Sequence, residues 1–357
     1  MVGFVAEWRN RCRSRAASNT LCAKSAAMAA DGNTEDRHEM NAGPPTRRTL
    51  ICGSLAYDTI MVFPDRFARH ILPDQAHVLS VSFQIGEMRR EWGGCAGNIA
   101  YNLAALGGDP VVMATIGDDG APYRERLATL GIATDGVRTI PGIYTAQAFI
   151  ITDLDDNQIT AFHPGAMNSS HENRVGDVEA VALGIVAPDG RDGMRTHVEQ
   201  FAAAQIPFIF DPGQALPLFS GPELVEMIDA ATYVAVNDYE GRLLAERTGL
   251  ALGAIAKRVD ALVVTLGAEG SRIFADGRAV DVPTVAPDAL VDPTGCGDAY
   301  RAGLLYGIAH GWDWDRTGRL AALLGSLKIA HRGGQNHTVS RDRIARLHHD
   351  RFGTYLW

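Results

Sequence analysis

The sequence predicts an α/β fold with a central, mostly parallel β-sheet, helices on both faces of that sheet, and a small additional group of strands. The first observation is that short apolar runs alternate with helical patterns along most of the chain, as in successive βαβ units. The second is that two segments, about 60–92 and 143–165, carry strand patterns instead. Because 46% of the 357 residues are hydrophobic, the chain can bury one large core, and we expect a single domain over 49–357.

Residues 1–48 differ from the rest of the chain. They are rich in Ala, Arg, Ser and Asn, lack a periodic apolar face and end close to Gly43-Pro44-Pro45, which is typical of a disordered segment. Their Arg- and Ser-rich beginning has the composition of an organelle transit peptide, but Glu7 and the acidic stretch 31–39 argue against one. We expect a dispensable N-terminal extension, with Met40 as an alternative start.

Charge and cysteine content exclude several classes of protein. The net charge is −9, although residues 1–48 carry eight Lys or Arg against five acidic residues, so the remainder is more acidic still and a poor nucleic-acid binder. The five cysteines are scattered without a Cys-x-x-Cys pair, which indicates a reducing cytoplasm without disulfides. No apolar run approaches the roughly 20 residues of a membrane span. We therefore expect a cytoplasmic protein, a monomer or homodimer, with small-molecule ligands.

The domain begins with a short apolar run, Thr49–Leu55, which ends in small residues and predicts a buried parallel strand. Asp58 follows it. Ligands of open α/β sheets bind outside the carboxyl ends of the strands, so Asp58 is a candidate for binding hydroxyl groups. A carboxylate that only stabilises an Asx turn is the alternative.

The two strand-rich segments are expected to form a lid. Residues 78–83 alternate in character, and the polar piece Asp65–Gln75 before them is too long for an ordinary βα loop. Tyr144–Thr160 has the pattern of a hairpin with its turn at Asp153–Asn157. His163 follows without a second His or Cys at metal-ligand spacing, so we expect a buried or turn-stabilising histidine.

A glycine-rich stretch, Gly93-Gly94-Cys95-Ala96-Gly97-Asn98, opens the next helical pattern, which stops at Gly107-Gly108. Glycines let the backbone approach a ligand, and the Asn98 amide can both donate to and accept from a diol. Val111–Ile116 then predicts a second core strand.

Strands and helices alternate through the remaining chain. The strand ends carry Asp211, then Asn237 and Glu240, then Thr265, Gly267 and Gly270. Glu240 alone is what the first turn of any helix favours. The expected strands are Ala182–Ala187, Pro207–Asp211, Tyr233–Val236, Ala261–Thr265 and Arg272–Phe274, and Leu320–Ala330 is an expected helix.

The stretch Asp292–Gly303 carries the strongest chemical signal. Its Gly-x-Gly runs into Asp298 and a helical pattern, which leaves free backbone N–H groups at a helix N-terminus and so predicts an anion site. Asp298 could be only a helix cap, but a carboxylate beside an anion-binding turn is also placed to act as a general base. Phosphoryl transfer needs this combination of positioning and charge neutralisation.

In this order, the motifs resemble those of the ribokinase-like (PfkB) sugar and nucleoside kinases over about residues 49–345. The family's C-terminal pattern is close to Asp-Thr-x-Gly-Ala-Gly-Asp-x-Phe, from which this chain departs at Pro293, Cys296 and Tyr300. The resemblance implies a three-layer sandwich with a small β-strand lid, and phosphoryl transfer from ATP with Mg²⁺. Neither a P-loop nor a dinucleotide-binding glycine motif is present to favour another nucleotide fold.

The resemblance also implies roles for individual residues. Asp298 is the general base, beside backbone amides that stabilise the migrating phosphoryl group. The implied residues are Gly295, Cys296 and Gly297 at those amides; Asp58, Gly93, Gly94 and Asn98 for substrate; Asn237, Thr265, Gly267 and Gly270 for ATP; Asn237 and Glu240 for Mg²⁺ through water; and Asp292 and Thr294, near 332–335, for a monovalent cation such as K⁺.

Substrate is the less determined part of the prediction. The lid segment 60–92, the run 161–166 and the 292–298 variant look most similar to bacterial adenosine and nucleoside kinases. We expect transfer to the 5′-hydroxyl of a ribonucleoside, adenosine or a related purine nucleoside. A ribokinase- or fructokinase-like sugar kinase, or a non-catalytic sensor on the same fold, is the alternative. Aromatic residues such as Phe63, Phe83 and Phe162 are either the wall of a purine site or lid packing.

Overall fold

The computed structural model of the protein describes residues 48–71, 81–155, 157–338 and 340–357. The extension expected over 1–48 lies outside the described residues except for Arg48, as do residues 72–80 of the first lid segment. Within the described ranges no helix is both long and apolar enough to cross a membrane.

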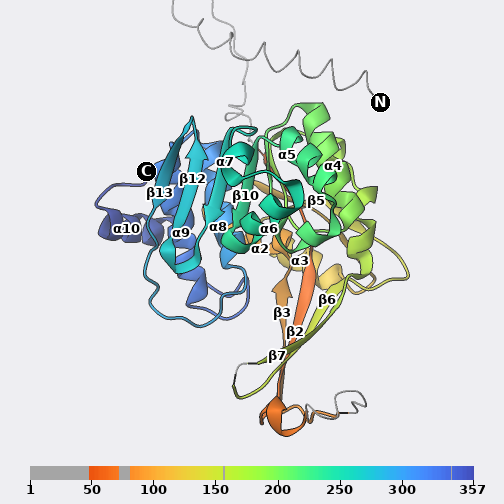
Figure 1. Ribbon diagram of the computed structural model, residues 1–357. Coiled ribbons are helices and arrows are strands. Elements are labelled where there is room, and N and C mark those ends of the chain that lie inside the picture. The colour runs from red at the N-terminus through yellow and green to blue at the C-terminus, as the bar shows by residue number, and fades with distance from the viewer. Residues whose placement is uncertain (1–47, 72–80, 156, 339) are drawn as a thin grey trace, which may run out of the picture. The chain divides into compact units, whose positions relative to one another are not determined.

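A nine-stranded sheet in the order β13-β12-β11-β10-β9-β8-β1-β4-β5 forms the centre of the fold (Figure 1). All pairings from β5 to β11 are parallel, and the two pairings at the other edge are antiparallel. The mostly parallel sheet predicted from the βαβ pattern is therefore confirmed. Its strands are β1 (Arg48–Cys52), β4 (Pro110–Ile116), β5 (Ala133–Thr139), β8 (Val181–Val186), β9 (Phe208–Phe210), β10 (Tyr233–Asn237), β11 (Ala261–Thr265), β12 (Ser271–Ala275) and β13 (Arg278–Val282).

The edge strand β13 is absent from the sequence prediction. It pairs with β12 through the two-residue turn Asp276-Gly277, whose φ angles are 51° and 73°. Asp-Gly is a strong signal for this kind of hairpin turn because both residues must adopt positive φ. The sequence thus contained a local signal for β13, although the strand itself, Arg-Ala-Val-Asp-Val, is short and half exposed.

Helices cover both faces of the nine-stranded sheet (Figure 1). Along β1, Ile51 packs into one core cluster with Leu304 of α8, whereas Leu50 and Cys52 pack into the other with Val198 of α4. This two-residue alternation assigns one apolar core to each face of the sheet and gives the expected three-layer sandwich. The helices are α2 (Cys95–Ala105), α3 (Ala121–Thr129), α4 (Arg191–Ala204), α5 (Gly221–Ala230), α6 (Asp238–Thr248), α7 (Leu252–Ile255), α8 (Cys296–Ala309), α9 (Trp314–Ile329) and α10 (Arg341–Phe352), with 3-10 helices η2 (Phe67–Arg69), η4 (Gly165–Glu172), η5 (Val175–Asp177), η6 (Gly213–Leu218) and η7 (Gly267–Glu269).

A second, four-stranded sheet has the order β3-β2-β6-β7. It extends away from the nine-stranded sheet in Figure 1. Its strands are β2 (Ala56–Val62), β3 (Glu87–Gly93), β6 (Ala146–Thr152) and β7 (Gln158–His163). They lie in the two segments where strands were expected, except that β2 begins four residues before the first of them. The hairpin of β6 and β7 is as predicted, and its turn is held by Asp153, whose carboxylate accepts from the amides of Phe67, Asp155 and Asn157 at 2.9–3.0 Å.

Two predictions for this sheet need correction. Residues 81–83 are not in a strand, and the strand of this segment is β3 instead, while 78–80 lie outside the described residues. Phe83 packs against Phe63 and Phe67, with ring centroids 4.8 and 5.1 Å apart, so the alternation around it reflects an aromatic cluster at the lid and not strand pairing. His163 is exposed at the end of β7 rather than buried, because β7 is an edge strand whose residues are all exposed.

Candidate active site

The predicted site residues gather at the carboxyl ends of the parallel strands. The chain leaves β1 at Ser54, whose hydroxyl and carbonyl oxygens accept from the amides of Cys95 and Ala96 at 3.2 and 3.0 Å. These bonds anchor the N-terminus of α2. The N-terminal half of α8 packs against α2, so the first turns of two helices meet above the ends of the sheet, where ligands of α/β folds bind.

Asp298, in the first turn of α8, is half-buried at this junction. Its Oδ2 accepts from Asn98 Nδ2 at 2.8 Å. Burial raises the pKa of Asp298 to about 7; the Asn98 bond lowers it, the charge of Asp211 raises it, and the charge of Arg301 and a bond from the Cys95 thiol lower it. A carboxyl group with this pKa is balanced between base and acid at neutral pH, which suits proton abstraction from a hydroxyl.

An ion pair that the sequence analysis did not identify lies beside Asp298. Arg301, one helical turn further along α8, donates to both oxygens of Asp211 at 3.1 and 3.2 Å, and the two side chains are only 5% and 7% exposed. Burial raises the pKa of Glu240, and the charge of Asp211 adds to this effect. Two features of the sequence pointed to this pair. Asp211 stands at the end of β9, and Arg301 lies three residues after Asp298, on the same face of the helix.

The glycine turn before α8 offers fewer amides than expected. Gly295 has a φ of 76° and caps the helix. The Cys296 amide donates to the Pro293 carbonyl at 3.1 Å, so it closes the turn and is not a free anion donor, contrary to the expectation. The amides of Gly295 and Gly297 have no partner among the described residues. A Cβ on Gly297 would meet nothing within 4 Å, so this face of the turn is open to a ligand.

Asp58 lies within β2, opposite Glu91 of β3, so it does not form the Asx turn that was the alternative to a hydroxyl contact. Burial, and then the charges of Glu91 and Asp292, raise its pKa to about 6. Gly93 is glycine because a Cβ there would come within 2.4 Å of Asp58 Oδ2. Gly94 has a φ of 85°, and its Cβ would meet the Ser54 carbonyl oxygen at 2.5 Å. Both glycines therefore let Asp58 and the α2 N-terminus pack closely.

Asn98 is 4% exposed and uses its amide within the protein. Besides its bond to Asp298, its Oδ1 accepts from Gln335 Nε2 at 3.2 Å, and Gln335 also donates to the Tyr123 hydroxyl at 2.8 Å. A Cβ on Gly334 would approach Asn98 Oδ1 to 2.2 Å. The structure thus places Asn98 as a link between the 332–335 loop and Asp298, where a diol contact was expected.

The residues expected at ATP lie at the ends of β10 and β11. Asn237 and Thr265 are directly paired in the sheet. Asn237 and Glu240 form a capping box on α6, since Asn237 Oδ1 accepts from the Glu240 amide at 2.8 Å and Glu240 Oε2 accepts from the Asn237 amide at 2.7 Å. Gly267 has a φ of 58° with open space at its Cβ position, whereas a Cβ on Gly270 would meet the Val282 carbonyl oxygen at 2.2 Å. Packing against β13 therefore explains why residue 270 is a glycine.

The donor set fits Mg²⁺ held through water. Among the described residues no three His, Cys, Asp or Glu side chains converge as a metal cage. Mg²⁺ in phosphoryl-transfer sites keeps several waters and takes one or two carboxylates together with the substrate phosphates. Glu240 retains Oε1 outside the capping box, so its carboxylate suits such an ion. Both oxygens of Asp211 accept from Arg301, and Asn237 Oδ1 accepts from the Glu240 amide, so neither side chain has the same freedom.

The donor set around Asp292 does not fit an exchangeable K⁺. The Asp292 carboxylate accepts from the amides of Thr294 and Gly333 at 2.9 and 2.8 Å, so each oxygen already has a partner. The Asp292 and His331 carbonyl oxygens both accept from Lys328 Nζ at 2.9 Å. A protein cation therefore takes two of the carbonyl oxygens of this region.

Comparisons with known proteins agree with this geometry. The family model described as "pfkB family carbohydrate kinase" matches residues 56–341. The nucleoside kinase of Methanocaldococcus jannaschii is 29% identical over 267 residues, covering 74% of this chain and 88% of the relative, and the ribokinase of Bacillus subtilis is 27% identical over 309 residues, covering 84% and 99%. A structure of the Burkholderia thailandensis nucleoside kinase in complex with inosine has a TM-score of 0.79 and 51% identity, covering 86% of this chain and 99% of that one. The chain belongs to the pfkB family of carbohydrate kinases and is a phosphotransferase with an alcohol group as acceptor.

Proposed function

We propose that this protein is an ATP-dependent nucleoside kinase that phosphorylates the 5′-hydroxyl of a purine ribonucleoside, with Asp298 as general base. The observation that carries the proposal is the contact of Asp298 with Asn98 beside the open amides of Gly295 and Gly297. This contact supports the proposal because a carboxyl group with a pKa of about 7 suits a general base, and unpartnered amides suit a phosphoryl group.

In the proposed reaction, Asp298 takes the proton of the acceptor hydroxyl while the hydroxyl oxygen bonds to the γ-phosphorus of ATP. The bond from that phosphorus to the β–γ bridging oxygen breaks, and ADP leaves. The amides of Gly295 and Gly297 donate to the phosphoryl oxygens as charge shifts onto them. Mg²⁺, when bound, neutralises charge on the phosphates. Asn98 positions Asp298, and the Arg301–Asp211 pair fixes the helix turn that carries it.

Asp58 is the proposed contact for the ribose hydroxyls. A hydroxyl can donate to the ionised Asp58 or accept from the protonated acid. Because the pKa of Asp58 is about 6, Asp58 is mainly a carboxylate at neutral pH. The nucleoside assignment is supported by the inosine complex of the relative from Burkholderia thailandensis and by its complex with ADP-inosine. Because a ribokinase is also among the relatives, a sugar remains the second candidate substrate.

A substrate panel tests the proposal. Production of ADP is measured with Mg-ATP and adenosine, inosine, 2′-deoxyadenosine, ribose or fructose, for the unaltered protein and for Asp58→Ala. We expect the highest kcat/KM with adenosine or inosine, and a KM for the nucleoside raised at least about tenfold by Asp58→Ala, because loss of a charged hydrogen bond costs on the order of 1.5–3 kcal/mol. A preference for ribose or fructose would replace the nucleoside with a sugar. Tight nucleoside binding without turnover would indicate a sensor.

A further inference from the structure

Lys328 is a buried cation that the proposed reaction does not use. It lies in the last turn of α9, and the residue is 0% exposed. Its ammonium group donates to the carbonyl oxygens of Asp292 and His331, both at 2.9 Å. Burying an ammonium group is costly unless charges and hydrogen bonds compensate for it, so these oxygens and the negative end of the α9 dipole stabilise it.

The two carbonyl groups belong to different loops. Asp292 begins the loop that leads to Gly295 and Asp298, and His331 begins the loop that leads to Gln335. The loops also meet through Asp292, whose carboxylate accepts from the Gly333 amide. The ammonium therefore links two loops by hydrogen bonds: the loop that carries the glycine turn and the loop that contacts Asn98. It also caps the C-terminus of α9.

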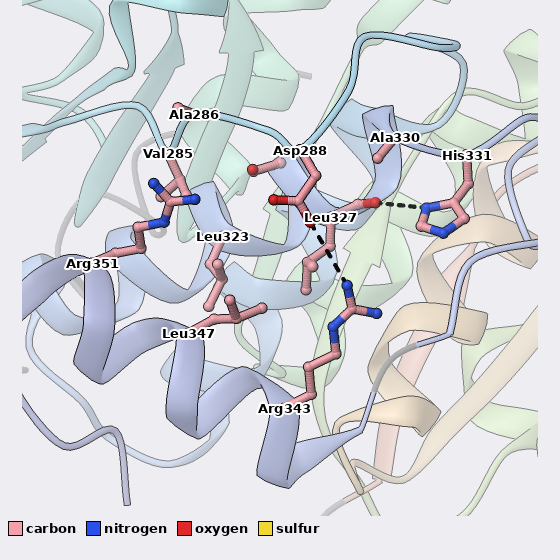
Figure 2. A pocket seen from close by; sticks show the side chains of 11 residues that line it. Val285, Ala286, Asp288, Leu323, Leu327, Ala330, His331, Arg343, Leu347 and Arg351 are labelled. Carbon is pink, nitrogen blue, oxygen red and sulfur yellow. Dashed lines mark hydrogen bonds and ion pairs between the residues drawn. The ribbon is translucent and has the colours of Figure 1, made fainter.

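The ammonium group lies among acidic groups and against the glycine turn. Burial lowers the pKa of Lys328, and the charges of Cys296, Asp292 and Asp298 offset this only in part. A Cβ on Gly295 would lie 3.7 Å from Lys328 Cε, so the lysine stem lies against the glycine turn. Figure 2 shows His331 and Leu327 at this helix end, where the His331 ring bonds to the Leu327 carbonyl oxygen at 3.1 Å, a contact that does not involve the amine.

We propose that the Lys328 ammonium is a built-in monovalent cation, which holds the 292–297 and 331–335 loops in their active arrangement and makes this kinase independent of K⁺. Its role in turnover rests on the proposed function, but its effect on the loops does not. The alternative is that Lys328 only caps α9. A cap satisfies carbonyl oxygens of its own helix end, whereas here the Asp292 oxygen comes from 36 residues away.

The test compares the unaltered protein with Lys328→Met, in K⁺ or tetramethylammonium chloride at equal ionic strength. Methionine keeps much of the length of the stem and removes the charge. Lys257→Met is the matched control, because Lys257 is exposed and is the other lysine of residues 48–357. The readouts are the melting temperature and the turnover of Mg-ATP with nucleoside.

For the unaltered protein and the control, exchanging the two salts should change turnover less than about twofold and leave the melting temperature unchanged. Lys328→Met should lose at least about tenfold in turnover in tetramethylammonium, and K⁺ should restore part of it and raise the melting temperature of this variant. The melting readout applies even if the substrate assignment is wrong. A K⁺ requirement of the unaltered protein would overturn the inference, whether or not the variant folds. A folded Lys328→Met variant that does not respond to K⁺ would also overturn it and identify Lys328 as a helix cap.

Discussion

At the scale of single residues, the site depends on two carboxyl groups whose burial raises their pKa values. The pKa of Asp298 is about 7 and that of Asp58 about 6. Both groups therefore change charge in the range where such an enzyme works. Their roles differ through their partners, because Asp298 lies beside the free amides before α8 and Asp58 faces Glu91 in the small sheet.

The first prediction concerns the pH dependence of turnover. Only ionised Asp298 can accept a proton, so kcat at saturating substrate should rise with pH and level off above about 7. Asp58→Asn should leave this rise of kcat with pH unchanged. It should abolish the change in the KM of the nucleoside near pH 6 that the unaltered protein is expected to show. A kcat that is flat between pH 5.5 and 8.5, with the chemical step shown to be rate-limiting, would contradict the role of Asp298.

The same pKa value predicts a stability effect. The folded protein holds the Asp298 proton up to about pH 7, whereas an unfolded chain releases it near the ordinary carboxyl pKa, so the folded state binds more protons in between. The contribution of Asp298 to the free energy of unfolding therefore falls as pH rises from about 4 to 7. Asp298→Asn should remove this component, which denaturant unfolding of both proteins at pH 5 and pH 8 measures. An identical pH slope in the two proteins would argue against the raised pKa.

At the scale of elements, glycines that look alike in the sequence have different causes. Gly297 lies on an open face of the turn, whereas protein atoms lie against the position that a Cβ would take on Gly93, Gly94, Gly270 and, less tightly, Gly295. The sequence alone indicated that something packs closely against each of these glycines. It did not indicate whether a ligand or protein atoms do so, because the neighbouring atoms come from other segments of the chain.

This difference predicts opposite results for two alanine substitutions. Gly297→Ala adds a methyl group where nothing lies within 4 Å, so the melting temperature should be kept or raised, while kcat/KM for ATP should fall at least about tenfold as the methyl group meets the phosphates. Gly270→Ala, at a φ of 89° and against Val282, should lower the melting temperature by several degrees. Thermal unfolding and ATP kinetics of both variants provide the check, and equal loss of stability would refute the distinction.

At the scale of the whole molecule, the sequence predicted the parallel sheet but not its edge strands β5 and β13. Local patterns suffice for the central strands, since apolar runs predict buried strands. The contacts of Asn98 could not be predicted, because its partners Asp298 and Gln335 are 200 and 237 positions away. The Asp211–Arg301 pair, 90 positions apart, was missed for the same reason.

The prediction for the N-terminal extension belongs to this scale and rests on the sequence alone, since residues 1–47 lie outside the described part. Deleting residues 1–46 should leave the melting temperature and kcat/KM unchanged, because that segment has no periodic apolar face to add to the core. Loss of folded protein on deletion would show that the extension belongs to the domain.

The central claim is that Asp298 acts as the base of a nucleoside kinase, and steady-state turnover of Asp298→Asn with Mg-ATP and inosine or adenosine tests it most directly. Asparagine preserves the size of the side chain and can still bond to Asn98, so binding of ATP and nucleoside, measured by calorimetry, should be nearly unchanged. We expect kcat to fall by roughly 10²–10⁴-fold, the usual contribution of a general base. A variant that binds both ligands and retains near-normal kcat would remove Asp298 from the proposed mechanism.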